Sequence, residues 1–308
     1  MNKGMQKYAE YLDQIEAELI RCTSESTIDS KQTVVDAMRY SLLSGGKRVR
    51  PVLTLAVANA LGSATDQNLL RLASAIEMIH AYSLIHDDLP AMDNDDLRRG
   101  KPTNHIIYGE GMAVLAGDGL LNLAYEELFN LCELQPTLNK ACLNIARKAG
   151  INGMIGGQSM DMTKFESDDP EISLQYLIKL QKLKTGGLIN AATLSGYYYA
   201  EAMQNTDNFN SQLEELFITY ADRLGLAFQI RDDLLDVMSN EEKLGKSIGK
   251  DMRDQKLTFV TLLGVEESKK YENKLYDEIV LILSKLEKLN VDIDFLSCFT
   301  SILMHRDY

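Results

Sequence analysis

A helical hydrophobic period runs through almost all of this 308-residue chain and is the strongest constraint on its fold. Near the start, Met5, Tyr8, Leu12, Ile15 and Leu19 recur at steps of three and four, which places them on one face of a helix. Only five prolines interrupt the chain, and the alternating pattern of strands bounded by Asn-Gly or Asp-Gly turns is essentially missing. The sequence therefore predicts an all-α protein.

The same period predicts where the later helices lie. After the first amphipathic helix, it predicts helices over residues 30–50, 51–61, 66–89, 111–131, 138–155, 171–200, 211–238, 257–268 and, with interruptions, 271–304. No Gly/Ser-rich or Pro-rich linker divides the chain. We therefore expect a single domain over residues 1–308.

The charge balance excludes several classes of partner. The chain carries 45 Asp and Glu against 32 Lys and Arg, which gives a formal net charge of −13. Nucleic acids and anionic membrane surfaces both favour an excess of Lys and Arg, so neither is expected to bind. No uncharged apolar run is long enough to span a membrane. Because the start lacks an apolar signal core and the four cysteines lack metal-binding or paired spacing, we expect a cytoplasmic protein.

Two acidic segments resemble each other, and each ends a long apolar helix. The first is Ile85-His86-Asp87-Asp88-Leu89 and the second is Ile230-Arg231-Asp232-Asp233-Leu234. In the second, Asp232 and Asp236 are four residues apart and share a helix face with Gln229. Carboxylates held so close repel one another, and a hard divalent cation relieves that repulsion.

The first acidic segment is denser. Asp87 and Asp93 are six residues apart, so a regular helix would point them in different directions. Pro90 disturbs the turn between them and is expected to let Asp93 fold back toward Asp87. His80 lies two turns before Asp87 on the same face, and Arg98 and Arg99 follow the motif.

An acidic patch is most often a solvated face, but two such segments next to basic residues favour a metal site. Oxygen ligands without His or Cys favour Mg²⁺, which commonly takes its remaining ligands from a substrate's phosphates. Cations that suit phosphate oxygens occur in Gly45-Gly46-Lys47-Arg48-Val49-Arg50-Pro51, in Lys184-Thr185-Gly186-Gly187 and at Lys246, Lys250 and Lys256. The sequence thus indicates a cavity that binds diphosphates between metal and Lys/Arg groups.

At these residues the chain resembles a known family. The segments Asp87–Asp93 with Arg98–Thr103, and Asp232–Asp236, resemble the two aspartate-rich motifs of the trans-isoprenyl diphosphate synthases, most closely the bacterial farnesyl diphosphate synthases. Gly156-Gly157-Gln158, Lys184-Thr185-Gly186, and Gly245-Lys246 with Asp251 and Lys256 match further signatures in order. The resemblance implies the isoprenoid synthase fold, a single large orthogonal and antiparallel helix bundle around a deep central cavity.

The resemblance also implies roles for individual residues. About three Mg²⁺ would be held by Asp87, Asp93 and Asp232, with support from Asp88, Asp233, Asp236, Gln158 and Asp161. Isopentenyl diphosphate would be bound by Lys47, Arg50, His80 and Arg99. The allylic diphosphate would be bound by Arg98, Lys184, Thr185, Gln229 and Lys246, and weaker assignments fall on Lys256, His305 and Arg306.

Product length in this family depends on residues just before the first motif. Tyr82 is five residues and Ser83 four residues before Asp87. The first motif of bacterial farnesyl diphosphate synthases carries two extra residues, as Asp87 to Asp93 does here, and with an aromatic residue at the fifth position the resemblance implies a fifteen-carbon product, farnesyl diphosphate. Isopentenyl diphosphate and allylic diphosphates would be the substrates, and a symmetric homodimer is expected.

Other functions stay open at this point. The same fold could make geranylgeranyl or longer prenyl diphosphates, or serve as a non-catalytic subunit of a prenyl synthase heterodimer. Both aspartate motifs are complete, which disfavours the subunit. A non-catalytic cation-binding protein would not require Lys47, Arg50, Arg98 and Arg99, and a terpene cyclase would have no use for the isopentenyl-binding set. The role of the apolar stretch Phe295–Met304 is left open.

Overall fold

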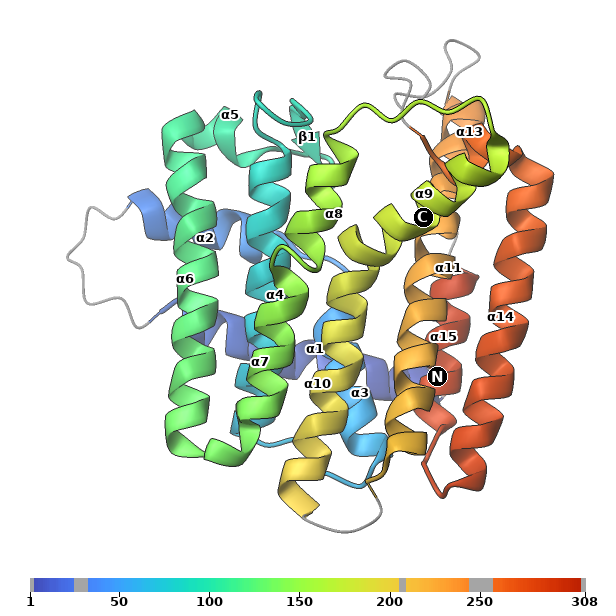
Figure 1. The fold of residues 1–308 in the computed structure, drawn as a ribbon. Coiled ribbons are helices and arrows are strands. Elements are labelled where there is room, and N and C mark those ends of the chain that lie inside the picture. Colours follow the sequence, from blue (N-terminus) through green and yellow to red (C-terminus); the bar gives the residue numbers. More distant parts are fainter. Residues whose placement is uncertain (1–2, 25–32, 205–208, 244–256, 306–308) are drawn as a thin grey trace. The chain divides into compact units, whose positions relative to one another are not determined.

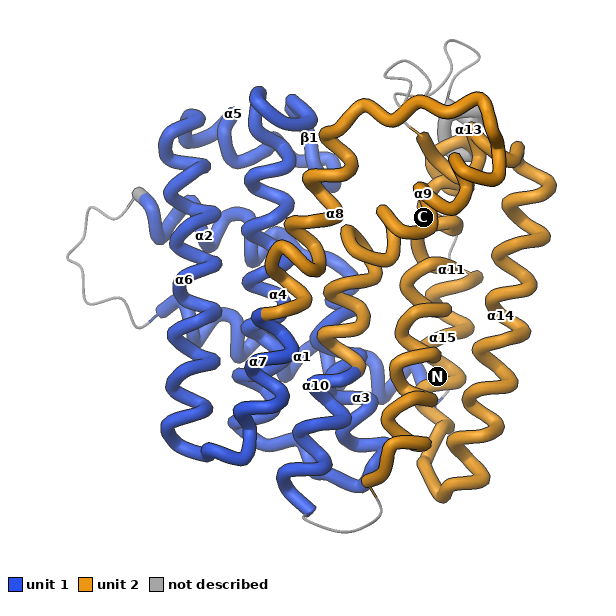
Figure 2. The backbone as a smooth tube through the Cα atoms, in the orientation of Figure 1, with its two compact units in different colours: residues 1–146, 194–205 blue, residues 147–193, 206–308 orange. Residues whose placement is uncertain are grey.

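The computed structural model describes residues 3–24, 33–204, 209–243 and 257–305, and these are almost entirely helical (Figure 1). The prediction of an all-α fold is therefore confirmed. Contacts divide the chain into two compact units, residues 1–146 with 194–205 and residues 147–193 with 206–308 (Figure 2). The single domain and its central cavity stay predictions.

Unit 1 is built from helices of the first half of the chain. They are α1 (Lys3–Cys22), α2 (Thr33–Leu42), α3 (Val49–Ala60), α4 (Gln67–Asp87), α5 (Asn104–Tyr108), α6 (Glu110–Leu134), the 3₁₀ turn η1 (Pro136–Leu138) and α7 (Asn139–Ala149), whose last three residues belong to unit 2. The end of α10 (Gly186–Gln204) joins unit 1 from Leu194 onward. Two short antiparallel strands, β1 (Leu97–Arg98) and β2 (Lys101–Pro102), follow α4.

Helix α4 is the core element of unit 1. Residues are buried on every side of it, from Leu69 to Ile85, because α1, α2, α3 and α6 all pack against it. Its start is fixed by Asp66, whose carboxylate accepts hydrogen bonds from the Leu69 amide at 2.9 Å and from the Tyr199 hydroxyl of α10 at 2.5 Å. A helix surrounded in this way presents functional groups mainly toward its ends.

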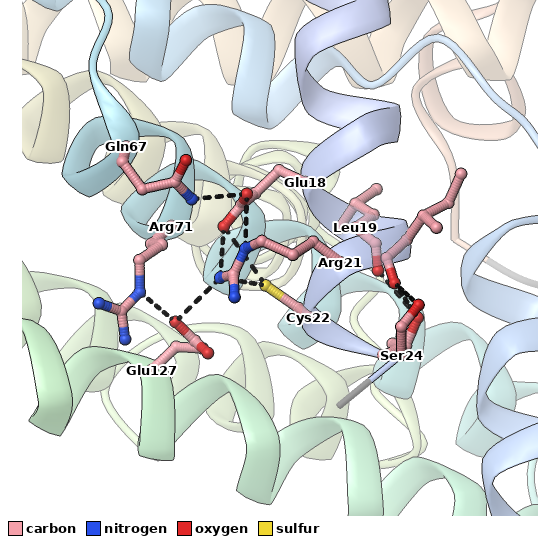
Figure 3. Close-up of polar contacts among 10 residues, drawn as sticks. Glu18, Leu19, Arg21, Cys22, Ser24, Gln67, Arg71 and Glu127 are labelled. Carbon is pink, nitrogen blue, oxygen red and sulfur yellow. Dashed lines mark hydrogen bonds and ion pairs between the residues drawn. The ribbon is translucent and has the colours of Figure 1, made fainter. Parts of the chain in front are cut away.

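A buried polar network ties α1, α4 and α6 together (Figure 3). Glu18 is 4% exposed and accepts hydrogen bonds from Arg21 and Gln67, both at 2.7 Å. Burial raises the pKa of Glu18, but these two hydrogen bonds outweigh burial and hold it below the usual value. Arg71 donates to Glu127 of α6 at 2.5 Å, so the carboxylates of this network are paired with cations.

Unit 2 consists of α8 (Met154–Asp161), α9 (Pro170–Lys184), the first part of α10, α11 (Ser211–Lys243), α13 (Phe259–Leu263), α14 (Val265–Lys288) and α15 (Asp294–Met304). Helix α11 is central here and packs against α9, α13, α14 and α15. The Tyr220 hydroxyl of α11 and the Thr300 hydroxyl of α15 share a buried hydrogen bond at 2.9 Å. The stretch Phe295–Met304 thus packs in the core of this unit, with Leu296, Phe299 and Leu303 buried.

The predicted helix over residues 30–50 is wrong between residues 43 and 48. Helix α2 ends at Leu42, and Gly45, Gly46 and Arg48 all have positive φ, which an α-helix cannot accommodate. The turn is Leu43-Ser44-Gly45-Gly46-Lys47-Arg48, which has one apolar side chain, and its Gly45-Gly46 pair was an available turn signal.

Three other boundaries also differ from the prediction. The segment 138–155 is broken between α7 and α8, and the segment 171–200 is broken at Thr185. The predicted break between 268 and 271 does not exist, because α14 starts at Val265 directly after Gly264. The end of α14 at Lys288 before α15 is an interruption of the kind predicted for 271–304. Among the described residues, no helix is long and apolar enough to cross a membrane.

Replacing Tyr199 by Phe should lower the free energy of unfolding by about 1 kcal/mol, because it removes a part-buried hydrogen bond from a fully buried tyrosine to the carboxylate that caps α4. Tyr40→Phe is the matched control: its hydroxyl donates to the Pro102 carbonyl at 2.7 Å at an exposed site, where water can replace it. Denaturant unfolding of both variants gives the comparison. Equal losses would show that the Asp66 contact does not stabilise the fold.

Candidate active site

The carboxyl end of α4 carries the first acidic motif on a tightly folded turn. Asp87 is the last residue of α4, and the amide of Asp93 donates to the Asp87 carbonyl at 2.8 Å. The amide of Asp95 donates to the Asp88 carbonyl at 3.2 Å. The backbone thus folds back after Pro90 and brings Asp93 beside Asp87, although the two are six residues apart.

Arg98 of β1 locks this turn through Asp88. Its Nε lies 2.8 and 2.9 Å from the two Asp88 oxygens, and its Nη2 lies 2.6 Å from Oδ1. Burial lowers the pKa of Arg98, but the hydrogen bonds to Asp88 and the charges of Asp88, Asp87 and Asp93 raise it above its usual value overall. Asp88 is 3% exposed and is committed to this pair, whereas Asp87 and Asp93 are half-buried.

The basic turn before α3 lies against Arg99. Arg99 donates from Nη1 to the Gly45 carbonyl, and a side chain at Gly46 would meet the Arg99 guanidinium at 2.7 Å. The φ of 136° at Gly46 favours glycine, whereas the Arg99 guanidinium is the end of a flexible side chain that could move aside. The structure brings Arg99 to the segment that contains Lys47 and Arg50.

His80, half-buried on α4, lies among the cationic residues of unit 1. Its pKa lies well below the usual value, first because of burial and then because of the positive charges of Arg50, Arg99 and Arg98. The ring is therefore neutral at neutral pH. The four residues predicted to bind isopentenyl diphosphate, Lys47, Arg50, His80 and Arg99, all belong to one neighbourhood of unit 1.

Tyr82 is held on α4 by a second ring. It is 6% exposed, and its ring meets that of His86 edge to face, with the centroids 5.7 Å apart. Burial raises the pKa of Tyr82 to about 12, with smaller contributions from Tyr125 of α6 and from Asp87. The Ser83 hydroxyl, in contrast, donates to the His80 carbonyl at 2.9 Å within α4.

A small pocket, partly open to solvent, lies beside Arg98 and Arg99 within unit 1. Its wall is apolar at Leu84 and Ile85, and Lys101 adds a third cation. Lys47, Arg50 and His80 do not line it, so this pocket by itself is not the whole of the predicted isopentenyl site.

In unit 2, Lys184 at the end of α9 forms an ion pair with Asp161 at the end of α8. The Lys184 Nζ lies 2.6 Å from the Asp161 Oδ2, and both side chains are about one-fifth exposed. Any side chain at Gly157 would lie 2.2 Å from the Lys184 amide, so glycine allows α8 and α9 to approach this closely. Lys184, predicted to bind the allylic diphosphate, and Asp161, predicted to support the metal site, therefore form an ion pair with each other.

Gln158 lies on α8, three residues before Asp161, and its side-chain amide is buried. Neither its Nε2 nor its Oε1 finds a hydrogen-bond partner among the described residues. A buried amide without partners is destabilising unless water or a ligand satisfies it. This supports the expectation that Gln158 orients water molecules near a bound ligand.

The second acidic motif is organised by Gln229 of α11. Its Oε1 accepts from the Thr185 hydroxyl at 2.8 Å, and its Nε2 donates to Asp233 at 2.9 Å. The other oxygen of Asp233 accepts from the Phe259 amide at the start of α13, also at 2.9 Å. Asp233 is thus occupied in positioning Gln229 and α13.

Asp232 and Asp236 also lie on α11. Asp232 is half-buried and Asp236 is exposed. Their helix places them on one face, as the spacing predicts. Lys246, Gly245, Asp251, Lys256 and Arg306 lie outside the described residues, so their predicted roles stay predictions.

The donor set fits a metal that is completed by a ligand. Among the described residues, no three His, Cys, Asp or Glu side chains gather closely enough to hold a metal by themselves. Mg²⁺ is commonly bound by one or two carboxylates together with water and phosphate oxygens, and a pair such as Asp87 and Asp93 suits that mode. The orphaned Gln158 amide is consistent with such bound water.

Sequence reasoning missed two residues around Tyr82. His86 braces its ring, and Gly117 of α6 makes room for His86, because a side chain there would lie 2.2 Å from the His86 Nε2. The spacing of four between Tyr82 and His86 was an available signal.

Acidification should destabilise the wild-type protein more than His80→Gln. The unfolded state binds a proton at His80 below its usual pKa of about 6.5, while the folded state stays neutral. The contribution of His80 to stability is therefore complete above pH 6.5 and decreases as pH falls. Between pH 7.5 and 5.5 the expected difference is about 1 kcal/mol in the free energy of unfolding.

The exposed His305 provides the control for this measurement. His305→Gln should keep the wild-type pH dependence of unfolding. If His80→Gln also keeps it, burial and the neighbouring arginines do not lower the pKa of His80.

Comparison with known proteins gives one consistent family. The sequence pattern of the family described as polyprenyl synthetase matches residues 31–290. A geranylgeranyl diphosphate synthase of Cyanophora paradoxa is 47% identical over 247 residues, which cover 80% of this chain and 79% of the relative. A farnesyl diphosphate synthase of Haemophilus influenzae is 41% identical over 292 residues, covering 94% and 95%.

A solved structure agrees with these sequences. An FPP/GFPP synthase from Zymomonas mobilis superimposes with a TM-score of 0.79 at 32% identity and covers 99% of both chains. Since a family match over most of the chain and two relatives above 40% identity accompany the paired acidic motifs, this protein belongs to the polyprenyl synthetase family and is a prenyltransferase.

Proposed function

We propose that this prenyltransferase condenses isopentenyl diphosphate with dimethylallyl and then geranyl diphosphate to give farnesyl diphosphate. The observation that carries the fifteen-carbon product is Tyr82, a buried aromatic residue five positions before Asp87 whose ring is fixed by His86. A buried ring at this position would stop a growing chain, because buried side chains resist displacement.

The proposed metal ligands are Asp87 and Asp93 in unit 1 and Asp232 in unit 2. Bound Mg²⁺, about three ions in all, would neutralise charge on the departing diphosphate. Asp88 keeps the first motif folded through Arg98, and Asp161 holds Lys184 in place. Arg98 and Lys184 would donate hydrogen bonds to the allylic diphosphate.

Thr185 and Gln229 would stabilise the allylic cation. The Thr185 hydroxyl donates to Gln229 at 2.8 Å, which leaves lone pairs of both oxygens available. Fixed dipoles of this kind stabilise developing charge without reorganisation. Asp233 contributes indirectly, since it accepts from the Gln229 amide and so fixes its orientation.

His80 would act as a neutral hydrogen-bond donor to isopentenyl diphosphate and not as a general base. Taking up a proton would bury a positive ring beside Arg50, Arg99 and Arg98, and burial and these charges lower the pKa of His80 well below its usual value. The proton lost in the elimination step would instead go to the released diphosphate, an anion next to the reacting carbons.

Two further proposals concern the setting of the enzyme. A homodimer is supported by exposed apolar side chains on α6 and α7, where Leu115, Phe129, Leu134 and Leu143 are between 49% and 72% exposed. A cytoplasmic location is supported by the four cysteines, all of which lie in described segments and are free thiols.

A geranylgeranyl product is the second candidate. The supporting observation is that geranylgeranyl diphosphate synthases are as similar to this chain as farnesyl diphosphate synthases are. Incubation of the purified protein with Mg²⁺, isopentenyl diphosphate and dimethylallyl diphosphate, followed by mass analysis of the prenols, separates the two. Twenty-carbon prenol would replace the farnesyl assignment, and no condensation would refute the proposed activity.

Tyr82→Ala should lengthen the product beyond fifteen carbons, because it removes the ring that His86 holds in place. Tyr82→Phe keeps the ring and should keep the fifteen-carbon product. Mass analysis of products from both variants tests this. Fifteen-carbon product from Tyr82→Ala would show that Tyr82 does not limit chain length.

Asp93→Asn should lower kcat by roughly 100-fold or more and raise the Mg²⁺ concentration needed for half-maximal rate, because one anionic ligand is lost. Asp96→Asn makes the same change at an exposed position three residues later and should leave both values within about twofold. Initial rates over a Mg²⁺ titration give the result, and similar behaviour of the two variants would remove Asp93 from the metal site.

A further inference from the structure

Arg48 lies between two predicted substrate-binding residues but points away from solvent. Its side chain is 2% exposed, whereas Lys47 before it is half-buried. Its backbone has φ 45° and ψ 41°, the left-handed region that a residue with a side chain rarely adopts. A conformation of this kind persists only where surrounding contacts enforce it.

Those contacts come from three helices. The Arg48 Nε donates to Glu16 of α1 at 2.7 Å, and Nη1 donates to Glu77 of α4 at 2.9 Å. Nη2 donates to the carbonyl of Leu42, the last residue of α2, at 2.7 Å. The carbonyl of Arg48 in turn accepts from the Val52 amide in the first turn of α3. One guanidinium thus joins α1, α2 and α4 at the point where α3 begins.

The geometry needs a guanidinium and two carboxylates. Glu77 is 3% exposed, so its charge would be unpaired without Arg48. Burial lowers the pKa of Arg48, but Glu16 and Glu77 raise it overall, which keeps the group charged. A lysine could neutralise Glu77 but could not reach three acceptors on three helices, because its donors sit on one nitrogen.

We propose that Arg48 is a positioning residue for isopentenyl diphosphate: by joining Glu16, Glu77 and the end of α2, it fixes the turn that presents Lys47 and Arg50 to the diphosphate. Arg48 itself does not touch the substrate. Tyr8 of α1 assists, because its hydroxyl donates to the Lys47 carbonyl at 2.5 Å. This inference rests on the proposed isopentenyl site.

The test is the KM for each substrate in Arg48→Lys and Glu77→Gln. Both variants should raise the KM for isopentenyl diphosphate about tenfold, with the KM for geranyl diphosphate and kcat changed less than about twofold. A role in stability alone would not affect one substrate selectively. If either variant fails to fold, Glu16→Gln carries the test, because Glu16 is 36% exposed and its loss is milder.

Arg71→Lys is the matched control. Arg71 also lies on α4 and bridges to another helix through Glu127 at 2.5 Å, within the network of Figure 3. It should leave both KM values unchanged even if it lowers the melting temperature. An unchanged KM for isopentenyl diphosphate in Arg48→Lys and Glu77→Gln, or equal changes for both substrates, would overturn the proposal.

Lys47→Ala separates this inference from the function on which it rests. If Lys47→Ala raises the KM for isopentenyl diphosphate and Arg48→Lys does not, only the positioning role fails. If Lys47→Ala has no effect on that KM, the proposed isopentenyl site itself is wrong.

Discussion

The pairing of Asp88 with Arg98 is the interaction on which the first acidic motif depends. Helix α4 is buried on every side, so its accessible functional groups lie toward its carboxyl end. Several carboxylates close together repel one another, and this repulsion disfavours the folded turn at that end of the helix. The three short contacts from Arg98 neutralise Asp88 and tie β1 to the helix, and the chain can then fold back to place Asp93 beside Asp87.

In unit 2, an uncharged side chain, that of Gln229, pairs with the second aspartate of the acidic motif. Gln229 connects Thr185 to Asp233, and Asp233 connects to the start of α13. In both motifs, the second aspartate of the Asp-Asp pair is buried in a structural contact, whereas the first is only half-buried. The two motifs therefore use their aspartates in the same way. The second aspartate, Asp88 or Asp233, forms a structural contact, and the first, Asp87 or Asp232, is the proposed metal ligand.

Much of the fold follows from the sequence because helical periodicity is a local property. The predicted segment 66–89 corresponds closely to α4, and the segment 111–131 to α6. The errors fall at bends, where the direction of the chain depends on contacts with other elements. The turn at residues 43–48 is the clearest example, since its left-handed residue Arg48 is stabilised by Glu16 and Glu77, which are distant in sequence.

The candidate site, like the fold, has features that follow from the sequence and features that depend on packing. The spacing of Asp232, Asp236 and Gln229 predicts that they share one helix face. Pro90 predicts the fold-back of the chain toward Asp87. The sequence does not predict contacts between elements, because these depend on which helices pack together. Examples are Lys184 with Asp161, Thr185 with Gln229, and His86 with Gly117.

The sequence by itself determined the all-α class, the positions of both acidic motifs and the family, because these depend on residue identity and spacing along the chain. Only the tertiary structure decided which charged groups form hydrogen bonds and ion pairs that stabilise the fold. Asp88, Asp233 and Arg48 look like site residues in the sequence, yet each is buried and hydrogen-bonded to a neighbouring element. The physical reason is that the pairing of a charged group depends on its distance to others in space, and that distance is set by packing.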